Sequence, residues 1–208
     1  MTRAVIFDFG DVMFRVSWPE VNKLFSERNG FDILLGDDPD KELREIYLNL
    51  HLGKEDFRNF LLAINPNLKE FDKAINDYKE AYSKKREMNG GILGMINGLK
   101  RGGIRVFGFT DTQREHYEAN LESGLCDNFE RVFTSFEFGH IKTEKAAFEM
   151  LADELKKLGI SPSECIFVDD RAKNTETARE SGFNAILYPD FPETEKLEKE
   201  IYEKIGKS

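Results

Sequence analysis

The segment AVIFDFGD, residues 4–11, joins an apolar run to a polar end, and it decides the architecture that we expect. Its first four residues are all apolar, which is typical of a parallel strand buried on both faces. Four further short apolar runs follow, at residues 104–109, 131–134, 165–168 and 185–188. Stretches with helical spacing of apolar residues lie between these runs. Strands that alternate with helices predict an α/β fold, a Rossmann-like parallel sheet with helices on both faces.

One part of the chain breaks this alternation. Between residues 14 and 88 we find no strand pattern, but four apolar stripes recur at helical spacing. Residues 43, 46, 47 and 50, for example, would share one helix face. We therefore expect an all-helical domain of four helices over residues 16–87, inserted into a core domain made of residues 1–15 and 88–208.

Composition and charge limit the classes of partner. The 208 residues are 40% hydrophobic and carry a net charge of -9, so the chain can bury a core but repels nucleic acid and anionic membranes. Cys126 and Cys165 are far apart and predict reduced thiols rather than a metal site. The first apolar run is too short for a signal peptide, and no run reaches membrane-spanning length. We expect a cytoplasmic monomer or dimer.

Chemically active side chains follow the apolar runs. Ligands of open parallel sheets bind beyond the carboxyl ends of the strands. The residues that follow four successive predicted strands are Asp8 with Asp11, Thr110 with Asp111, a loop leading to Lys142, and Asp169 with Asp170. Each alone has an ordinary explanation, since polar residues commonly end strands and Asp caps helices. Together, these mutually repelling carboxylates predict a divalent cation among them, and oxygen ligands without His favour Mg²⁺.

The order of these motifs resembles the haloacid dehalogenase superfamily. The helical insertion after the first motif resembles that superfamily's type 1 cap, found in subfamily IA. Residues 53–57 (GKEDF) resemble a recurrent turn of this cap, and residues 142–144 resemble the motif around the family's lysine, with Thr143 in place of the usual Pro. The segment at residues 112–116 resembles a subgroup that includes glucose-1-phosphate phosphatases.

The resemblance implies a phosphatase that acts on a small phosphorylated metabolite. Asp8 would attack phosphorus and form an aspartyl-phosphate. Mg²⁺ would be held by Asp8, the backbone carbonyl of Gly10 and Asp170, with help from Asp169. The remaining roles are phosphate binding by Thr110, Asp111 and Lys142, and orientation of the metal loop by Asn174.

Position 10 departs from the family's pattern. The family's phosphatases usually carry a second Asp there, which protonates the leaving group and then activates water, whereas this chain has Gly10. We expect slower turnover, since a positioned acid–base group contributes roughly 10²- to 10⁴-fold. Asp11 is a candidate replacement. Glycine here resembles the glucose-1-phosphate phosphatase subgroup, whose anomeric phosphate is a better leaving group, and this favours a sugar phosphate.

Substrate choice is expected to lie with the helical insertion and its surroundings. Arg15 could contact an anion, and Trp18 could line an apolar wall or simply pack the cap against the core. Arg114 and His116 follow the second motif and could face the cleft, although a lone His is more often a surface or capping residue.

Three other functions remain open from the sequence. A non-catalytic or very slow binding protein would explain Gly10. A 2-haloacid dehalogenase also uses an Asp nucleophile, but it needs no metal and leaves the pair at residues 169–170 unexplained. A phosphomutase would need the acid–base group that position 10 lacks.

Overall fold

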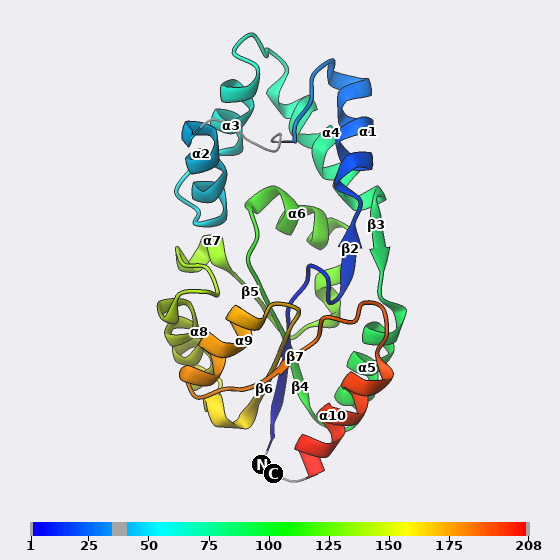
Figure 1. Cartoon of the computed structure of the whole chain (residues 1–208), viewed down its shortest axis with the longest axis vertical. Helices are drawn as coiled ribbons and strands as arrows, with labels where there is room; N and C mark the ends of the chain where they lie inside the picture. Colours follow the sequence, from blue (N-terminus) through cyan, green and yellow to red (C-terminus); the bar gives the residue numbers. More distant parts are fainter. Residues whose placement is uncertain (1, 35–40, 207–208) are drawn as a thin grey trace.

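The computed structural model describes residues 2–34 and 41–206 (Figure 1). Residues 35–40, which fall in the predicted helical insertion, lie outside the described residues, as do residues 1, 207 and 208 of the predicted core domain. None of the helices in the described ranges combines the length and the apolar character that crossing a bilayer requires.

A five-stranded sheet forms the centre of the lower body in Figure 1. Its strand order is β5-β4-β1-β6-β7, and every neighbouring pair is parallel. The strands are β1 (Ala4–Phe7), β4 (Arg105–Thr110), β5 (Val132–Thr134), β6 (Cys165–Asp169) and β7 (Asn184–Leu187). Each coincides with one of the five apolar runs to within about two residues, which is the usual uncertainty of an element boundary.

Helices cover both faces of this sheet. The side chains of Val5 and Phe7 pack into a core with α5 (Gly90–Arg101) and α10 (Glu195–Gly206), while those of Ala4 and Ile6 pack into a second core with α8 (Lys145–Lys157) and α9 (Ala172–Glu180). The alternation follows from the two-residue period of a strand. The predicted α/β Rossmann-like fold is therefore confirmed. The helices of this part are α5 (Gly90–Arg101), α6 (Arg114–Glu122), η1 (Leu125–Asn128), α7 (Ser135–Phe138), α8 (Lys145–Lys157), η2 (Pro162–Glu164), α9 (Ala172–Glu180) and α10 (Glu195–Gly206).

Four helices lie beyond the carboxyl ends of the strands, at the top of Figure 1. They are α1 (Trp18–Asn29), α2 (Lys41–His51), α3 (Phe57–Ile64) and α4 (Phe71–Lys84). They enclose a third apolar core, in which the ring of Phe57 stacks on that of Tyr78 with centroids 4.8 Å apart. We call α1–α4 the helical module. The division of the chain into two domains at residues 15/16 and 87/88 stays a prediction.

A short two-stranded ribbon joins the helical module to the sheet. It pairs β2 (Phe14–Val16) with β3 (Arg86–Met88) in antiparallel register. The expectation that residues 14–88 contain no strand is therefore wrong. Three residues are too few to show the alternating pattern that marks a strand in a sequence. The pairing forms because the segments that enter and leave the helical module lie side by side.

A second contact brings the end of α2 down to α7. Gly53, in the turn after α2, has φ +65°, and a Cβ atom there would lie 2.2 Å from the carbonyl oxygen of Phe136. Only glycine combines this backbone conformation with so close an approach. The turn at residues 53–57 thus holds the module's α2 above the edge of the sheet (Figure 1).

Candidate active site

A buried lysine joins three of the strand ends. Lys142, in the loop between α7 and α8, is 1% exposed. Its Nζ lies 2.7 Å from Oδ1 of Asp8 and donates to Oδ2 of Asp169 at 2.6 Å. Burial opposes the charged form, but the nearby carboxylates of Asp169, Asp8 and Asp111 outweigh it and raise the pKa of Lys142. The lysine therefore supplies a fixed positive charge at this point.

Asp169 holds this lysine in place. It is 0% exposed, and its two oxygens accept from the Lys142 ammonium, from the backbone N–H of Arg171 at 2.9 Å and from Nδ2 of Asn174 at 3.0 Å. So many donors occupy Asp169 that its main contribution is to orient Lys142 and the loop after β6. Asn174 donates to Asp169, and its role in orienting this loop stays a prediction.

The carboxylate of Asp8 has one anchored oxygen. Oδ1 accepts from the backbone N–H of Phe9 at 2.7 Å and lies 2.7 Å from Lys142 Nζ. In the described part of the chain both of these partners bind Oδ1, so Oδ2 is available for chemistry. Burial raises the pKa of Asp8 well above its ordinary value, while Lys142 favours the ionised form.

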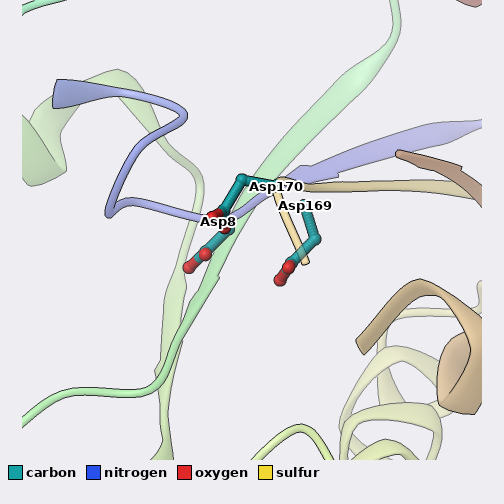
Figure 2. Close-up of side chains that lie close together, drawn as sticks. All are labelled: Asp8, Asp169 and Asp170. Atoms are coloured by element: carbon teal, nitrogen blue, oxygen red, sulfur yellow. The ribbon is translucent and has the colours of Figure 1, made fainter. Parts of the chain in front are cut away.

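Three carboxylates gather where β1 and β6 end (Figure 2). One oxygen from each of Asp8, Asp169 and Asp170 lies within 4.8 Å of the others. With one ammonium against three carboxylates, the cluster keeps an excess of negative charge. Burial and the neighbouring Asp169 raise the pKa of Asp170 to about 6. A hard divalent cation held by oxygen ligands fits this donor set and its charge.

The end of β4 and the loop that carries Lys142 form the side of the site opposite the three carboxylates. Thr110 ends β4 and is 4% exposed, and Asp111 follows it. Both oxygens of Asp111 accept the backbone N–H of Lys142, at 3.0 and 3.2 Å, which ties the lysine loop to the end of β4. The structure thus brings together Asp8, Thr110, Asp111, Lys142 and the pair at residues 169–170.

A cavity of about 340 Å³ opens between the strand ends and the helical module. Gly10, Thr110 and Asp111 line its lower side. Aromatic rings of the module and its ribbon line the rest, and these belong to Phe14, Trp18, Tyr47 and Tyr82, with His51 and His116 beside them.

Asp11 and Arg15 lie at the mouth of this cavity and bind each other. Nε of Arg15 donates to Oδ1 of Asp11 at 2.7 Å, and the guanidinium lies over the ring of Phe191. Asp11 has φ +53°, a conformation that Asp tolerates better than most residues. Its carboxylate is therefore directed to Arg15, which weakens the hypothesis that Asp11 serves as the acid.

His116 and Trp18 line the cavity in a packed aromatic group, and their contact with a substrate stays a prediction. The imidazole of His116 stacks on Tyr82 with centroids 4.1 Å apart, and its Nε2 lies 2.8 Å from the hydroxyl of Tyr78. Trp18 lies 5.5 Å from the His116 ring. Burial lowers the pKa of His116 well below its ordinary value, so the ring is neutral and shapes the wall.

Arg114 does not line this cavity. It begins α6, and its guanidinium lies over the ring of Phe136, 5.0 Å from the centroid, at a separate hollow beside the turn at residues 53–57. The structure gives no support to the expectation that Arg114 contacts the substrate.

Tyr47 and His51 are cavity residues that the sequence did not reveal. Both lie on α2, one helical turn apart, and reach the cavity because the turn at residues 53–57 holds the end of α2 above the sheet. The sequence signal that could have indicated them is that His51 lies two residues before Gly53, where this turn begins.

Comparison with known proteins agrees with this fold. A family model described as haloacid dehalogenase-like hydrolase matches residues 2–182. Since this is most of the chain, the protein belongs to the haloacid dehalogenase-like hydrolases.

Individual relatives are distant. Drimenol cyclase drtB of Aspergillus calidoustus is 25% identical over 197 residues, covering 90% of this chain but 34% of its own length. YhcW of Bacillus subtilis is 24% identical over 115 residues, covering 53% of this chain and 51% of its own. The chain thus spans about a third to a half of the length of these curated relatives.

Among solved structures, a haloacid dehalogenase family enzyme of Bacteroides thetaiotaomicron, bt-2542, in complex with magnesium and inorganic phosphate, has a TM-score of 0.73. It is 19% identical, and the match covers 95% of this chain and 99% of that one. At this identity the likeness supports the fold.

Proposed function

We propose that this chain is a Mg²⁺-dependent phosphatase that hydrolyses a small phosphorylated metabolite through an aspartyl-phosphate on Asp8. The observation that carries the proposal is the fixed geometry around Asp8. Its Oδ1 is held by Phe9 N–H and by the Lys142 ammonium, at 2.7 Å each, which leaves Oδ2 for attack beside the carboxylate of Asp170.

In the proposed reaction, Oδ2 of Asp8 attacks phosphorus and the substrate oxygen leaves. Lys142 neutralises part of the negative charge that two approaching anions share, and the Thr110 hydroxyl can donate to a phosphoryl oxygen. Asp8, the Gly10 carbonyl and Asp170, with Asp169 close by, would hold Mg²⁺. When bound, this ion would reduce the repulsion between carboxylate and phosphate and bind a phosphoryl oxygen. Water then releases phosphate and restores Asp8.

The lining of the cavity favours a substrate whose leaving group carries no charge, so that the phosphate is its one charged group. Arg15 is the one Lys or Arg side chain on its described lining, and Asp11 already neutralises it at 2.7 Å. The walls are aromatic faces, which pack well against a ring, while hydroxyls could meet the polar groups of the strand ends. A sugar monophosphate fits this lining, and Gly10 favours one with a good, anomeric leaving group.

The nucleophile can be tested directly. Asp8→Asn cannot attack phosphorus, so we expect the Mg²⁺-dependent hydrolysis of a panel of sugar monophosphates and p-nitrophenyl phosphate to fall by more than roughly 10²-fold. Asp153→Asn, the same change at an exposed site on α8, is the matched control. A folded Asp8→Asn variant that keeps its activity would refute the assignment.

Gly10 favours one alternative, a protein that binds a phosphorylated ligand without turning it over. Beryllofluoride with Mg²⁺ mimics a phosphorylated Asp, so a raised melting temperature in wild type but not in Asp8→Asn supports a reactive Asp8. Binding of substrates without any release of phosphate would favour the alternative. Activity on a haloacid that survives EDTA would instead indicate a dehalogenase.

A further inference from the structure

Position 10 has room for a side chain but carries none. A Cβ atom on Gly10 would meet nothing within 4 Å. The neighbouring Asp11 is bound to Arg15. If the proposed function is right, the water that cleaves the aspartyl-phosphate needs another group to take its proton, because an aspartyl-phosphate held away from bulk water is cleaved slowly without a positioned base.

The described lining of the cavity offers few candidates for this base. Asp111 uses both oxygens to hold the backbone of Lys142. Nε2 of His116 is bonded to Tyr78, and its ring is stacked on Tyr82. The phenol of Tyr82 is buried, which raises its pKa. Burial likewise raises the pKa of the Tyr47 phenol, and the Asp11 carboxylate is directed to Arg15. The remaining imidazole on this lining is that of His51.

The hydrogen bonding of His51 defines its state. Nδ1 lies 3.0 Å from the carbonyl oxygen of Tyr47, one turn earlier on α2. A carbonyl can only accept, so Nδ1 carries the proton, and the neutral ring keeps its lone pair on Nε2. No partner of Nε2 is found in residues 2–34 and 41–206.

The charges around His51 suit a base. Burial lowers the pKa of His51, whereas the Tyr47 carbonyl and the negative charge of Asp111 act in the opposite direction. Besides the Tyr47 carbonyl and Asp111, the neutral ring of His116 faces His51. Burial and, to a smaller extent, His51 lower the pKa of His116. The ring is therefore unprotonated at neutral pH, and Asp111 can stabilise the imidazolium that forms when it accepts a proton.

We propose that His51 is the general base of the second half-reaction, supplied by the helical module in place of the side chain that Gly10 lacks. Nε2 takes a proton from water while the water oxygen bonds to phosphorus. The bond between phosphorus and the Asp8 oxygen breaks, and its electron pair returns to the carboxylate. The imidazolium then releases its proton to solvent. In the first half-reaction an alkoxide leaving group takes a proton from water in the cavity, and the hydroxide that forms is neutralised by the proton that the imidazolium later releases.

The test separates the two half-reactions. With p-nitrophenyl phosphate and Mg²⁺, His51→Gln should release one equivalent of nitrophenolate in a burst, followed by steady turnover slowed roughly 10²- to 10⁴-fold. Intact-mass measurement should find the phosphorylated chain. The kcat should fall far more than kcat/KM, since the first step is spared. His140→Gln is the matched control, because the His140 side chain is 41% exposed and pairs with Glu144.

Two further measurements sharpen the test. In wild type, kcat should rise as pH rises through the pKa of His51, and His51→Gln should lose this dependence. Gly10→Asp should restore at least roughly tenfold of the lost turnover in the His51→Gln background, because it returns a base to the open position.

Three results would overturn the proposal. They are a His51→Gln variant with wild-type kcat, a variant slowed in the burst itself, and a double variant as slow as His51→Gln alone. Failure of the proposed function is distinguishable, since wild type would then behave like Asp8→Asn, with neither burst nor phosphorylated chain.

Discussion

Replacing Lys142 by Met tests whether this one ammonium holds the cluster of carboxylates together. Met has nearly the same length, and the Lys142 ammonium already lies 6.0 and 5.7 Å from the ring centroids of Phe109 and Phe167, so the variant loses charge rather than packing. The change leaves the carboxylates of Asp8 and Asp169 buried without their counter-ion.

The expected loss of stability is large. Removing one partner of a buried ion pair typically lowers the free energy of unfolding by about 3–5 kcal/mol, because the remaining charge is left uncompensated. For a chain of this size that corresponds to a melting temperature lower by about 6–20 °C. Adding Asp169→Asn to Lys142→Met removes one of the two stranded charges and should return about 1–3 kcal/mol.

The assay is urea unfolding followed by far-UV circular dichroism, in EDTA so that no metal replaces the lost charge. Lys145→Met is the matched control on the neighbouring helix. Its side chain is 64% exposed and its ammonium pairs with Glu149, and such pairs contribute about 0–1 kcal/mol. If Lys142→Met lost no more stability than this control, or if Asp169→Asn returned nothing, the argument that Lys142 holds the site together would be refuted.

Three further outcomes follow from the structure. Burial raises the pKa of Glu115 to about 7, so its contribution to stability is complete below pH 4.5 and is lost as pH rises through 7. Above pH 7 the free energy of unfolding of Glu115→Gln, measured in urea titrations, should exceed that of wild type by up to roughly 3 kcal/mol. Parallel pH profiles of the two proteins would contradict this. Gly53→Ala should lower the free energy of unfolding by about 1–3 kcal/mol, because of its φ of +65° and the close Phe136 carbonyl, whereas Gly94→Ala, in open space on α5, should be neutral or stabilising. Mg²⁺ should raise the melting temperature of wild type but not of Asp170→Asn, and an equal rise in both would place the cation elsewhere.

The local sequence was sufficient to predict the strands of the sheet and the polar residues that follow them along the chain. Continuous apolar runs such as residues 4–7 mark strands buried on both faces, and in a parallel sheet their carboxyl ends share one edge. The grouping of Asp8 and Asp169 therefore followed from their positions at the ends of their strands, and that of Lys142 from the loop that leads on from β5 and α7. It is a consequence of strand direction, so no knowledge of side-chain packing was needed.

Side-chain partners outside the sheet could not be predicted in the same way. Arg114 was expected to face the cleft, but the start of α6 directs it over Phe136. Asp11 was a candidate acid, but the turn after β1 places it against Arg15. Successive residues of a helix or turn point their side chains in different directions, so a shift of one residue changes the neighbour that a side chain meets. Packing between elements sets this direction, and the local sequence pattern does not.

By itself, then, the sequence determined the parallel sheet, the presence of helices between its first two strands and the chemical groups at the strand ends, because strand and helix periodicity are local properties. The tertiary structure alone decided what faces those groups. His51 lines the cavity because the turn at Gly53 packs the end of α2 closely against α7. The aromatic side chains line the same cavity because the pairing of β2 with β3 positions the helical module beyond the strand ends. These contacts join residues far apart in the chain, and no local pattern encodes them.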